Sequence, residues 1–228
     1  MIGRVGIDLY PNQLSTPLRD VRTYTRFVGG FASNTATGLA RLGVRVAIWQ
    51  ISLEDVDLEE MAAALLYATG TGLAQSPSRE TTLTLLEGHR GTSVFDLDWR
   101  PSLWERPEEF PELANRAAAA ADLVVGNEEE VDAARLDEVP VLVLKRGEHG
   151  ATVYERGEES NVPAWPVEVV NGLGAGDAFA SAMGHGLLRG LSLVEAVRRG
   201  TVAGAIVVSQ LACSEAMPRL EELEAALV

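Results

Sequence analysis

"DLVVGNEEEVDAARLDEVPVLVLKRGEHG", residues 122–150, sets an acidic stretch between two runs of apolar, largely β-branched residues. The runs 122–127 and 140–147 resemble strands of a parallel sheet that is covered on both faces. The three glutamates that follow Asn127 favour the start of a helix, because negative charge is stabilised there. A strand, a helix and a second strand form a right-handed crossover unit, so this stretch predicts an α/β fold.

The same alternation continues through the rest of the chain. Strands are expected at 4–10, 44–49, 92–98, 122–127, 140–147 and 151–156, the last pairing closely with its predecessor through the turn at 147–150. Helices are expected at 33–43, 77–88, 107–121, 191–212 and 217–227, and one should follow the glycine-rich stretch at 171–177. We found no internal repeat or low-complexity linker, so residues 1–228 are expected to form a single α/β domain.

Composition narrows the classes of partner. The chain has 228 residues, of which 46% are hydrophobic, but it contains no run of about 18 apolar residues that would predict a membrane span. Its net charge of −14 argues against binding a nucleic-acid backbone. The single cysteine excludes an internal disulfide, and the beginning of the sequence lacks a signal-peptide pattern. We expect a soluble cytoplasmic protein with neither nucleic-acid nor membrane partners.

The stretch "NGLGAGDAFASAMGHGLLRG", residues 171–190, raises the sharpest functional question. Gly172, Gly174 and Gly176 come just before Asp177 at the start of an apolar helix. One interpretation is a flexible turn with Asp177 as the helix cap. The other is an anion cradle built from backbone N–H groups, with Asp177 as a base that takes a proton from a hydroxyl attacking a phosphoryl group.

Polar residues at predicted strand ends support a binding site, because ligands in such folds bind beyond the carboxyl ends of the strands. Asp8, Asp98, Asn127 and Lys145 all occupy such positions. Each has a plainer interpretation as a loop or capping residue. The Walker A pattern is absent and GLGAGD does not extend to GxGxxG, which argues against P-loop and dinucleotide-binding proteins.

"FVGGFASNTATGLARLG", residues 27–43, has a paired glycine ahead of a helix. It is either a tight turn with a cap or a surface on which a polyol lies against Gly29 and Gly30 while Asn34 hydrogen-bonds its hydroxyls.

Two further stretches carry possible ligands of a substrate and a metal. In "FDLDWRPSLW", residues 95–104, Arg100 can pair with a carboxylate and Asp98 can accept hydroxyl protons, unless the loop only packs its aromatic residues. Asn127 and Glu130, three residues apart, could hold Mg²⁺ with its waters, since this ion prefers oxygen ligands.

The order of these motifs resembles that of the PfkB, or ribokinase-like, family of carbohydrate kinases. The pattern is GG-x(3)-N, then N-x-x-E, K-x-G-x-x-G and G-A-G-D, and it spans nearly the whole chain. The resemblance implies a three-layer sandwich around a mostly parallel sheet, and transfer of the γ-phosphate of ATP to a primary hydroxyl with Mg²⁺. Within the family, the stretches "DLYPNQLSTPLRDVRTYTRFVGG", "TGTGLAQSPSRE", "FDLDWRPSLW" and "LACSEAMP" most resemble the 5-dehydro-2-deoxygluconokinases of myo-inositol breakdown. The alternatives are 2-keto-3-deoxygluconate kinases or another sugar kinase of the family.

The resemblance also implies a role for individual residues. The catalytic group would be Asp177 as base, with Gly174, Ala175 and Gly176 as the anion hole. The substrate would be held by Asp8, Gly29, Gly30, Asn34, Asp98 and Arg100. The nucleotide and Mg²⁺ would be held by Asn127, Glu130, Lys145, Gly147, Gly150 and Gly174, with Ala203 and Val207 near the adenine. A monovalent cation such as K⁺ near Asn171 is left open.

The chain departs from the family in length. After the predicted strand at 44–49, relatives carry a sizeable stretch with a small β-sheet lid, which we expect to be missing near residues 50–51. Shorter losses are expected near 91–92, after 134 and around 160. A lidless chain could be a non-catalytic nucleotide- or sugar-binding protein, and a homodimer formed through the lid would be lost.

Overall fold

The computed structural model describes residues 1–13, 15–48, 63–211 and 213–228. Its centre is a six-stranded sheet with the order β3-β4-β5-β6-β7-β8, parallel from β3 to β6 and antiparallel from β6 to β8. The strands are β3 (Leu65–Thr69), β4 (Thr92–Asp96), β5 (Leu123–Asn127), β6 (Val141–Lys145), β7 (Ala151–Glu155) and β8 (Glu158–Val162).

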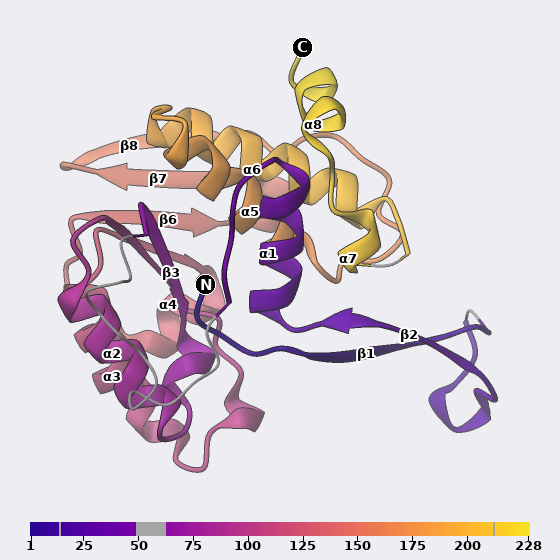
Figure 1. Ribbon diagram of the computed structural model, residues 1–228, viewed down its shortest axis with the longest axis horizontal. Helices are drawn as coiled ribbons and strands as arrows, with labels where there is room; N and C mark the ends of the chain where they lie inside the picture. The colour runs from indigo at the N-terminus through magenta and orange to yellow at the C-terminus, as the bar shows by residue number, and fades with distance from the viewer. Residues whose placement is uncertain (14, 49–62, 212) are drawn as a thin grey trace.

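Helices cover both faces of this sheet (Figure 1). One face carries α1 (Phe31–Arg41), α5 (Ala175–Leu188) and α6 (Leu193–Val208), and the other carries α2 (Ser78–Gly88), α3 (Phe110–Ala119) and α4 (Glu128–Ala134). Two short helices, α7 (Cys213–Ala216) and α8 (Leu220–Leu227), pack outside α1 and α6. Single 3₁₀ turns lie at η1 (Leu18–Asp20), η3 (Gly70–Leu73), η4 (Pro101–Leu103), η5 (Pro107–Glu109) and η6 (Gly147–His149). The predicted three-layer α/β sandwich is confirmed.

Each strand contributes side chains to two hydrophobic cores, one on each face of the sheet. Tyr67 and Val125 face α1 and α5, whereas their neighbours Leu66 and Val124 face α2 and α3. Successive side chains of a strand point to opposite faces, so a continuous apolar run fills both cores at once. This explains why strands such as 122–127 carry no polar alternation.

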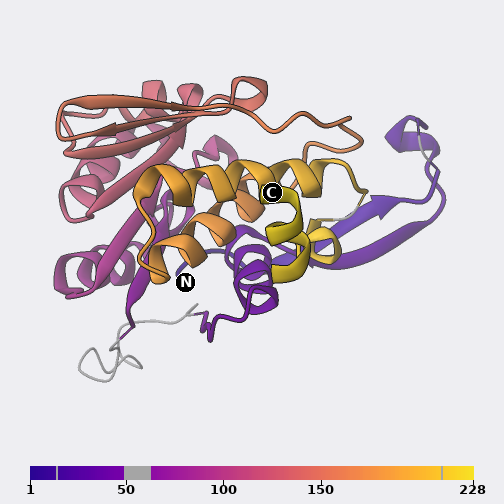
Figure 2. The ribbon, with the colours of Figure 1, turned by 90° about the horizontal axis from the view of Figure 1, so that it is seen from above.

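A second, small sheet projects from the body, where Figures 1 and 2 show it as a long ribbon. It is an antiparallel hairpin of β1 (Gly6–Pro11) and β2 (Tyr24–Gly29). The expectation that 4–10 is a buried strand of the main sheet is therefore wrong. Ile7 and Leu9 are 68% and 63% exposed on the outer face, because only their alternate neighbours turn towards the body.

Most of the other differences lie in the first third of the chain, although the strand β8 was not expected either. The expected strand at 44–49 is not a strand over its described residues, and Ala47 instead accepts a hydrogen bond from the N-terminal amine. The edge position belongs to β3, whose Tyr67 carbonyl accepts from the amide of Ile2. The alanine-rich sequence leading into β3 gave no strand signal. The gap expected near 50–51 lies outside the described residues.

No helix within the described ranges is long and apolar enough to cross a membrane.

Candidate active site

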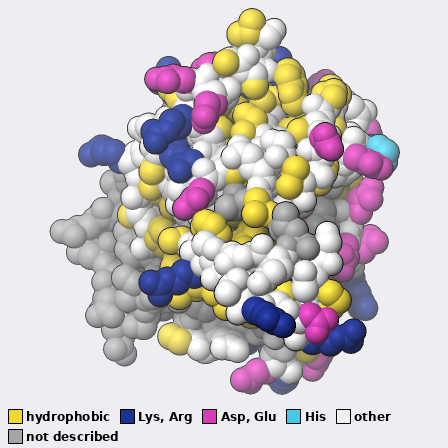
Figure 3. Space-filling view, turned by 90° about the vertical axis from the view of Figure 1, so that its right-hand side faces the viewer, with side chains coloured by type: hydrophobic (Ala, Val, Ile, Leu, Met, Phe, Trp, Pro, Cys, Tyr) yellow, Lys and Arg dark blue, Asp and Glu magenta, His cyan; other side chains and the backbone are white. Residues whose placement is uncertain are grey.

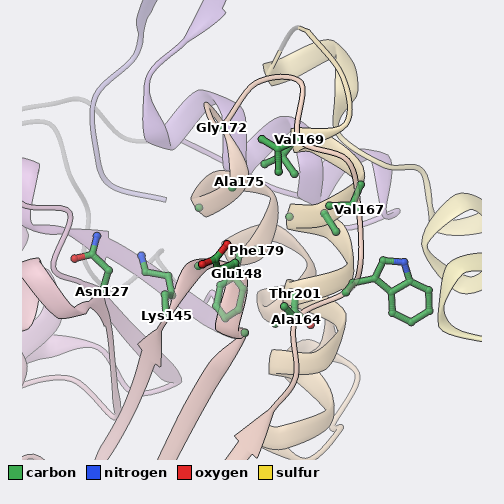
Figure 4. A pocket seen from close by; sticks show the side chains of 18 of the residues that line it. Asn127, Lys145, Glu148, Ala164, Val167, Val169, Gly172, Ala175, Phe179 and Thr201 are labelled. Carbon is green, nitrogen blue, oxygen red and sulfur yellow. The ribbon is translucent and has the colours of Figure 1, made fainter.

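A cavity of about 790 Å³ opens at the carboxyl ends of β5 and β6 (Figure 4). Asn127 and Lys145, the last residues of these strands, are paired across the sheet and both line it. The first turn of α5 closes one side, and α6 with the segment 164–169 forms the other. Five segments of the chain therefore meet at one site.

Asp177 lies in the first turn of α5, where its carboxylate Oδ2 accepts a 2.7 Å hydrogen bond from Asn34 Nδ2. Burial raises the pKa of Asp177 to about 7, and the negative charges of Asp98 and Asp96 act in the same direction. The hydrogen bond from Asn34 and the charge of Lys145 oppose the rise, because both stabilise the ionised form. A carboxyl group with this pKa can gain and lose a proton near neutral pH.

The turn before Asp177 has the geometry of an anion cradle. Gly174 caps α5 with φ of 83°, a left-handed conformation that favours glycine. A Cβ added there would meet Cys213 Sγ at 2.5 Å, so the position also lacks room for a side chain. The next three amides, of Ala175, Gly176 and Asp177, begin α5 and have no acceptor one turn earlier in the helix, whereas that of Ala178 donates to the Gly174 carbonyl. Such N–H groups attract an anion.

Asn34, in the first turn of α1, is 3% exposed, and its Oδ1 has no hydrogen-bond partner in the described part of the chain. The glycine pair before α1 leaves little space: a Cβ at Gly29 would meet the Asp8 carboxylate at 2.2 Å, and one at Gly30 would meet the Arg4 carbonyl at 2.4 Å. The structure therefore places Asp8 against Gly29, and Asn34 against Asp177. Buried polar atoms usually have a hydrogen-bond partner, so the Oδ1 of Asn34 is available to accept a hydrogen bond from a ligand.

Asp98 and Arg100 form an ion pair of 3.1 Å between Oδ1 and Nη2. Thr71 donates to the other oxygen of Asp98 at 3.1 Å. Burial raises the pKa of the Asp98 carboxyl, the charge of Asp96 adds to the rise, and Arg100 opposes it. The guanidinium of Arg100 is largely exposed and reaches the wall of the cavity, where it can meet an anionic ligand.

Asn127 and Glu130 form a capping box at the start of α4. Each side chain accepts a 2.8 Å hydrogen bond from the backbone amide of the other. Burial raises the pKa of Glu130, although the nearby Lys145 ammonium opposes the rise. Asn127 and Glu130 both line the cavity, so the two residues of the capping box also face a space that a ligand can fill.

Lys145 is held between two carboxylates, with its Nζ 3.2 Å from Asp96 Oδ1 and 3.7 Å from Glu130 Oε2. Burial lowers the pKa of Lys145, but the charges of Asp96 and Glu130 raise it by more, so that the net shift is upward. No role was expected for Asp96 from the sequence. The signal was present, because Asp96 is the first of the two acids in "FDLDWRPSLW".

The face of α6 that lines the cavity differs from the one expected. Ala203 and Val207 do not line the cavity and are buried in one cluster with Leu42, Val202 and Met217, where Val207 also lies close to Gly174. The residues of α6 that line it are Gly200, Thr201, Gly204, Ala205 and Val208. Gly204 and Val208 each come one residue after Ala203 and Val207. One residue corresponds to about 100° of rotation around the helix axis, so the expected pair lies on a different face of α6.

Gly147 and Gly150 line the cavity as expected, with Gly150 at φ of 83°. The side chain of Asn171 has two partners: it donates to the carbonyl of Leu211, just beyond α6, at 2.7 Å and accepts from the Leu173 amide of its own loop at 3.1 Å. No group of three or more His, Cys, Asp or Glu side chains that could hold a metal occurs among the described residues. A divalent ion at Asn127 and Glu130 would therefore need further oxygen ligands from a bound molecule or from water.

Comparison with known proteins gives consistent results. A model of the pfkB family carbohydrate kinases matches residues 49–220. The 5-dehydro-2-deoxygluconokinases of Clostridium tetani and Geobacillus thermodenitrificans are 27% and 29% identical, each over 98% of this chain and 90% of the relative. Their alignments extend over 306 and 305 residues, more than this chain contains, so the relatives carry segments with no counterpart here.

Among solved structures, the aminoimidazole riboside kinase of Salmonella enterica, complexed with aminoimidazole riboside and an ATP analogue, superposes with a TM-score of 0.85. It shares 21% identity, and the match covers 100% of this chain and 98% of that one. At this identity the likeness establishes the fold.

Proposed function

Because this chain belongs to the pfkB family of carbohydrate kinases, we propose that it transfers the γ-phosphate of ATP to a primary hydroxyl of a deoxy-keto-sugar acid. The favoured substrate is 5-dehydro-2-deoxy-D-gluconate, a step of myo-inositol breakdown, because relatives 27% and 29% identical are named for it. The isomeric 2-keto-3-deoxygluconate is the alternative. The enzyme acts in the cytoplasm as a single domain.

The proposal rests on Asp177, whose carboxylate lies in the first turn of α5 beside the free backbone amides. The pKa of this carboxyl group is raised to about 7. A base that titrates near the working pH is suited to proton transfer. Asp177 takes the proton of the substrate hydroxyl while that oxygen bonds to the γ-phosphorus and the bond to ADP breaks. The amides of Ala175 and Gly176 lie at the same helix start, where they stabilise charge on the transferring group.

The substrate subsite is the group around Asn34. Its buried Oδ1 accepts a hydrogen bond from a sugar hydroxyl, while its amide keeps Asp177 in place. Asp8 and Asp98 accept from further hydroxyls, and the backbone at 29–30 lies against the sugar because no side chain intervenes. The exposed guanidinium of Arg100 binds the carboxylate of the sugar acid.

The nucleotide occupies the cavity. Its phosphates lie near Lys145, Gly147 and Gly150, and its adenine packs on the cavity-facing side of α6. The amide and carboxylate oxygens of Asn127 and Glu130 fit Mg²⁺, which would neutralise phosphate charge when bound. These two residues would hold the ion together with phosphate oxygens and water.

The hairpin provides an interface for a homodimer. Ile7, Leu9 and Val28 lie on its outer face and are more than half exposed. Figure 3, which views the molecule from the side on which the hairpin projects, shows exposed hydrophobic side chains among charged ones. Leu9→Glu should convert a dimer to a monomer in sedimentation; a wild-type monomer would contradict this part of the proposal.

The deciding experiment is an ATP-dependent phosphorylation assay with each of the two sugar acids, with the product identified by mass spectrometry. Asp177→Asn is the control, because it keeps the shape of the site and removes the base. Turnover of either acid that depends on Asp177 supports the kinase, and a higher kcat/KM identifies the substrate. Turnover of neutral sugars alone would contradict the assignment of a sugar acid.

A further inference from the structure

Asp96 is a buried carboxylate whose contacts suggest a task beyond folding. It ends β4, is 1% exposed, and is not among the residues that line the cavity. Three groups donate to it. The Tyr67 hydroxyl contacts Oδ2 at 3.0 Å, the Lys145 ammonium contacts both oxygens at 3.2 and 3.3 Å, and the Asp98 amide contacts Oδ1 at 3.3 Å.

These contacts cross the sheet. Tyr67 lies on β3, Asp96 on β4 and Lys145 on β6, so the lysine side chain reaches past β5 to meet the carboxylate. A lysine carries its charge on a flexible four-carbon stem, and its position depends on what anchors the ammonium. Here the anchor is Asp96, because Glu130, the other carboxylate nearby, is 0.5 Å more distant by the salt-bridge distances of 3.2 and 3.7 Å.

We propose that Asp96 is a positioning residue that holds the Lys145 ammonium at the floor of the cavity, where it meets the phosphates of a bound nucleotide. The inference rests on the proposed function, since it takes the cavity to be the nucleotide site. Asp96 does not touch the ligand and acts only through the lysine. Without this carboxylate, Lys145 turns to Glu130, which then loses part of its capacity to organise Mg²⁺.

A contribution to the stability of the fold does not by itself explain a buried ion pair such as that of Asp96 and Lys145. A buried ion pair costs desolvation that its attraction only partly offsets, and an apolar pair of similar size often stabilises a fold as well. Asp96 also accepts from the amide of Asp98, whose carboxylate contacts Arg100. The Asp96 carboxylate therefore holds Lys145, in the proposed nucleotide site, and also the backbone of Asp98, in the proposed substrate site.

A double-mutant cycle with Asp96→Asn and Lys145→Met separates positioning from folding. The measurements are the calorimetric affinity for Mg·ADP and the steady-state KM values for Mg·ATP and the sugar acid. We expect Asp96→Asn to weaken Mg·ADP binding about tenfold and to raise the KM for Mg·ATP similarly, with the KM for the sugar acid changed less than threefold. In the Lys145→Met background, Asp96→Asn should have no further effect on nucleotide affinity, since the two residues act as one unit.

Tyr67→Phe is the matched control, because it removes one donor to Asp96 and leaves Lys145 in place; nucleotide affinity should stay within threefold of wild type. Equal losses from Asp96→Asn in both backgrounds would overturn the inference, as would wild-type affinity in Asp96→Asn. If Asp96→Asn alone does not fold, the double variant, in which neither charge remains, is compared with Lys145→Met: a further loss of nucleotide affinity in the double variant would overturn the inference. A wild-type protein that binds no nucleotide refutes the proposed function itself, whereas binding with an additive cycle refutes only the role of Asp96.

Discussion

The amide of Asn34 donates a 2.7 Å hydrogen bond to the carboxylate of Asp177, although 143 residues separate the two in the chain. The bond joins the first turn of α1 to the first turn of α5, and both turns follow a glycine with positive φ. Asn34 thereby fixes Asp177 through its Nδ2, while its own Oδ1 has no partner in the described part of the chain. Under the proposed function, the base and an acceptor for a sugar hydroxyl are therefore held as one pair.

Replacing Asp177 with Asn should abolish most turnover while nucleotide binding survives. The amide keeps an oxygen for the Asn34 hydrogen bond but cannot accept the proton of the substrate hydroxyl. We expect kcat to fall by about 10²–10⁴, the usual contribution of a general base, and the affinity for Mg·ADP to change little. An ADP-release assay and calorimetry measure the two quantities, and unchanged turnover would remove Asp177 from its role.

The rate should rise with pH through about 7. Asp177 has its pKa raised to about 7, so below that pH it is mostly protonated and cannot act as a base. Asn34→Ala should move this limb to higher pH, because the hydrogen bond from Asn34 favours the ionised carboxylate. A pH profile of kcat for both proteins tests this, and a flat wild-type profile between pH 6 and 8 would refute it.

The raised pKa of Asp177 also predicts a pH effect on stability. Its folded pKa of about 7 exceeds its ordinary value of 3.8, so the folded protein binds an extra proton between these values. Its contribution to the free energy of unfolding is therefore present below about pH 4 and is lost as pH rises towards 7. Asp177→Asn should be more stable than wild type at pH 8, with the difference shrinking at pH 4. Thermal melts at both pH values measure it.

Gly174→Ala should damage both folding and catalysis. The residue needs φ of 83°, and its Cβ would meet Cys213 Sγ at 2.5 Å. A non-glycine residue in such a conformation costs about 1–3 kcal/mol, and relief of the strain would shift the amides of the cradle. Gly88→Ala is the control, because Gly88 does not line the cavity and a Cβ there meets nothing within 4 Å. Equal loss of kcat in both variants would contradict the cradle at Gly174.

Arg100→Met should raise the KM for the sugar acid about tenfold, because charge-assisted hydrogen bonds contribute about 1.5–3 kcal/mol when sheltered and less when exposed. The KM of Arg100→Lys for the sugar acid should lie between those of the wild type and Arg100→Met, because lysine keeps the positive charge but lacks the planar guanidinium. Arg106→Met is the matched control, since this exposed arginine of the same loop region pairs with Glu109 and does not line the cavity. Steady-state kinetics on each variant decide, and no change in Arg100→Met would exclude a carboxylate partner there.

Two substitutions on α6 test which face meets the nucleotide. Thr201→Phe places a large ring in the cavity and should raise the KM for Mg·ATP at least tenfold. Val207→Ala alters the opposite, buried side of the helix, so it should lower stability by about 1 kcal/mol and leave that KM unchanged. If instead Val207→Ala raised the KM for Mg·ATP and Thr201→Phe did not, Val207 rather than Thr201 would lie at the adenine site.

The order of the motifs and most of the central sheet could be predicted from the sequence. The strands at 122–127 and 140–147 are found because continuous apolar runs report burial on both faces, which is a local property. The same holds for the glycine-rich start of α5, since a helix start and its charge preference depend on neighbouring residues alone. The family and the kinase class follow from these local patterns taken in order.

Tertiary structure alone decided which surfaces the local elements meet. An apolar stretch such as 4–10 reveals that a strand is favoured, but not that its partner is 24–29 and that Ile7 and Leu9 remain exposed. The bond from Asn34 to Asp177 and the anchoring of Lys145 by Asp96 likewise join residues from separate elements. Their energies depend on distance and burial, which no local pattern encodes, and so the sequence determined the parts of the site while the packing of the sheet and helices determined their geometry.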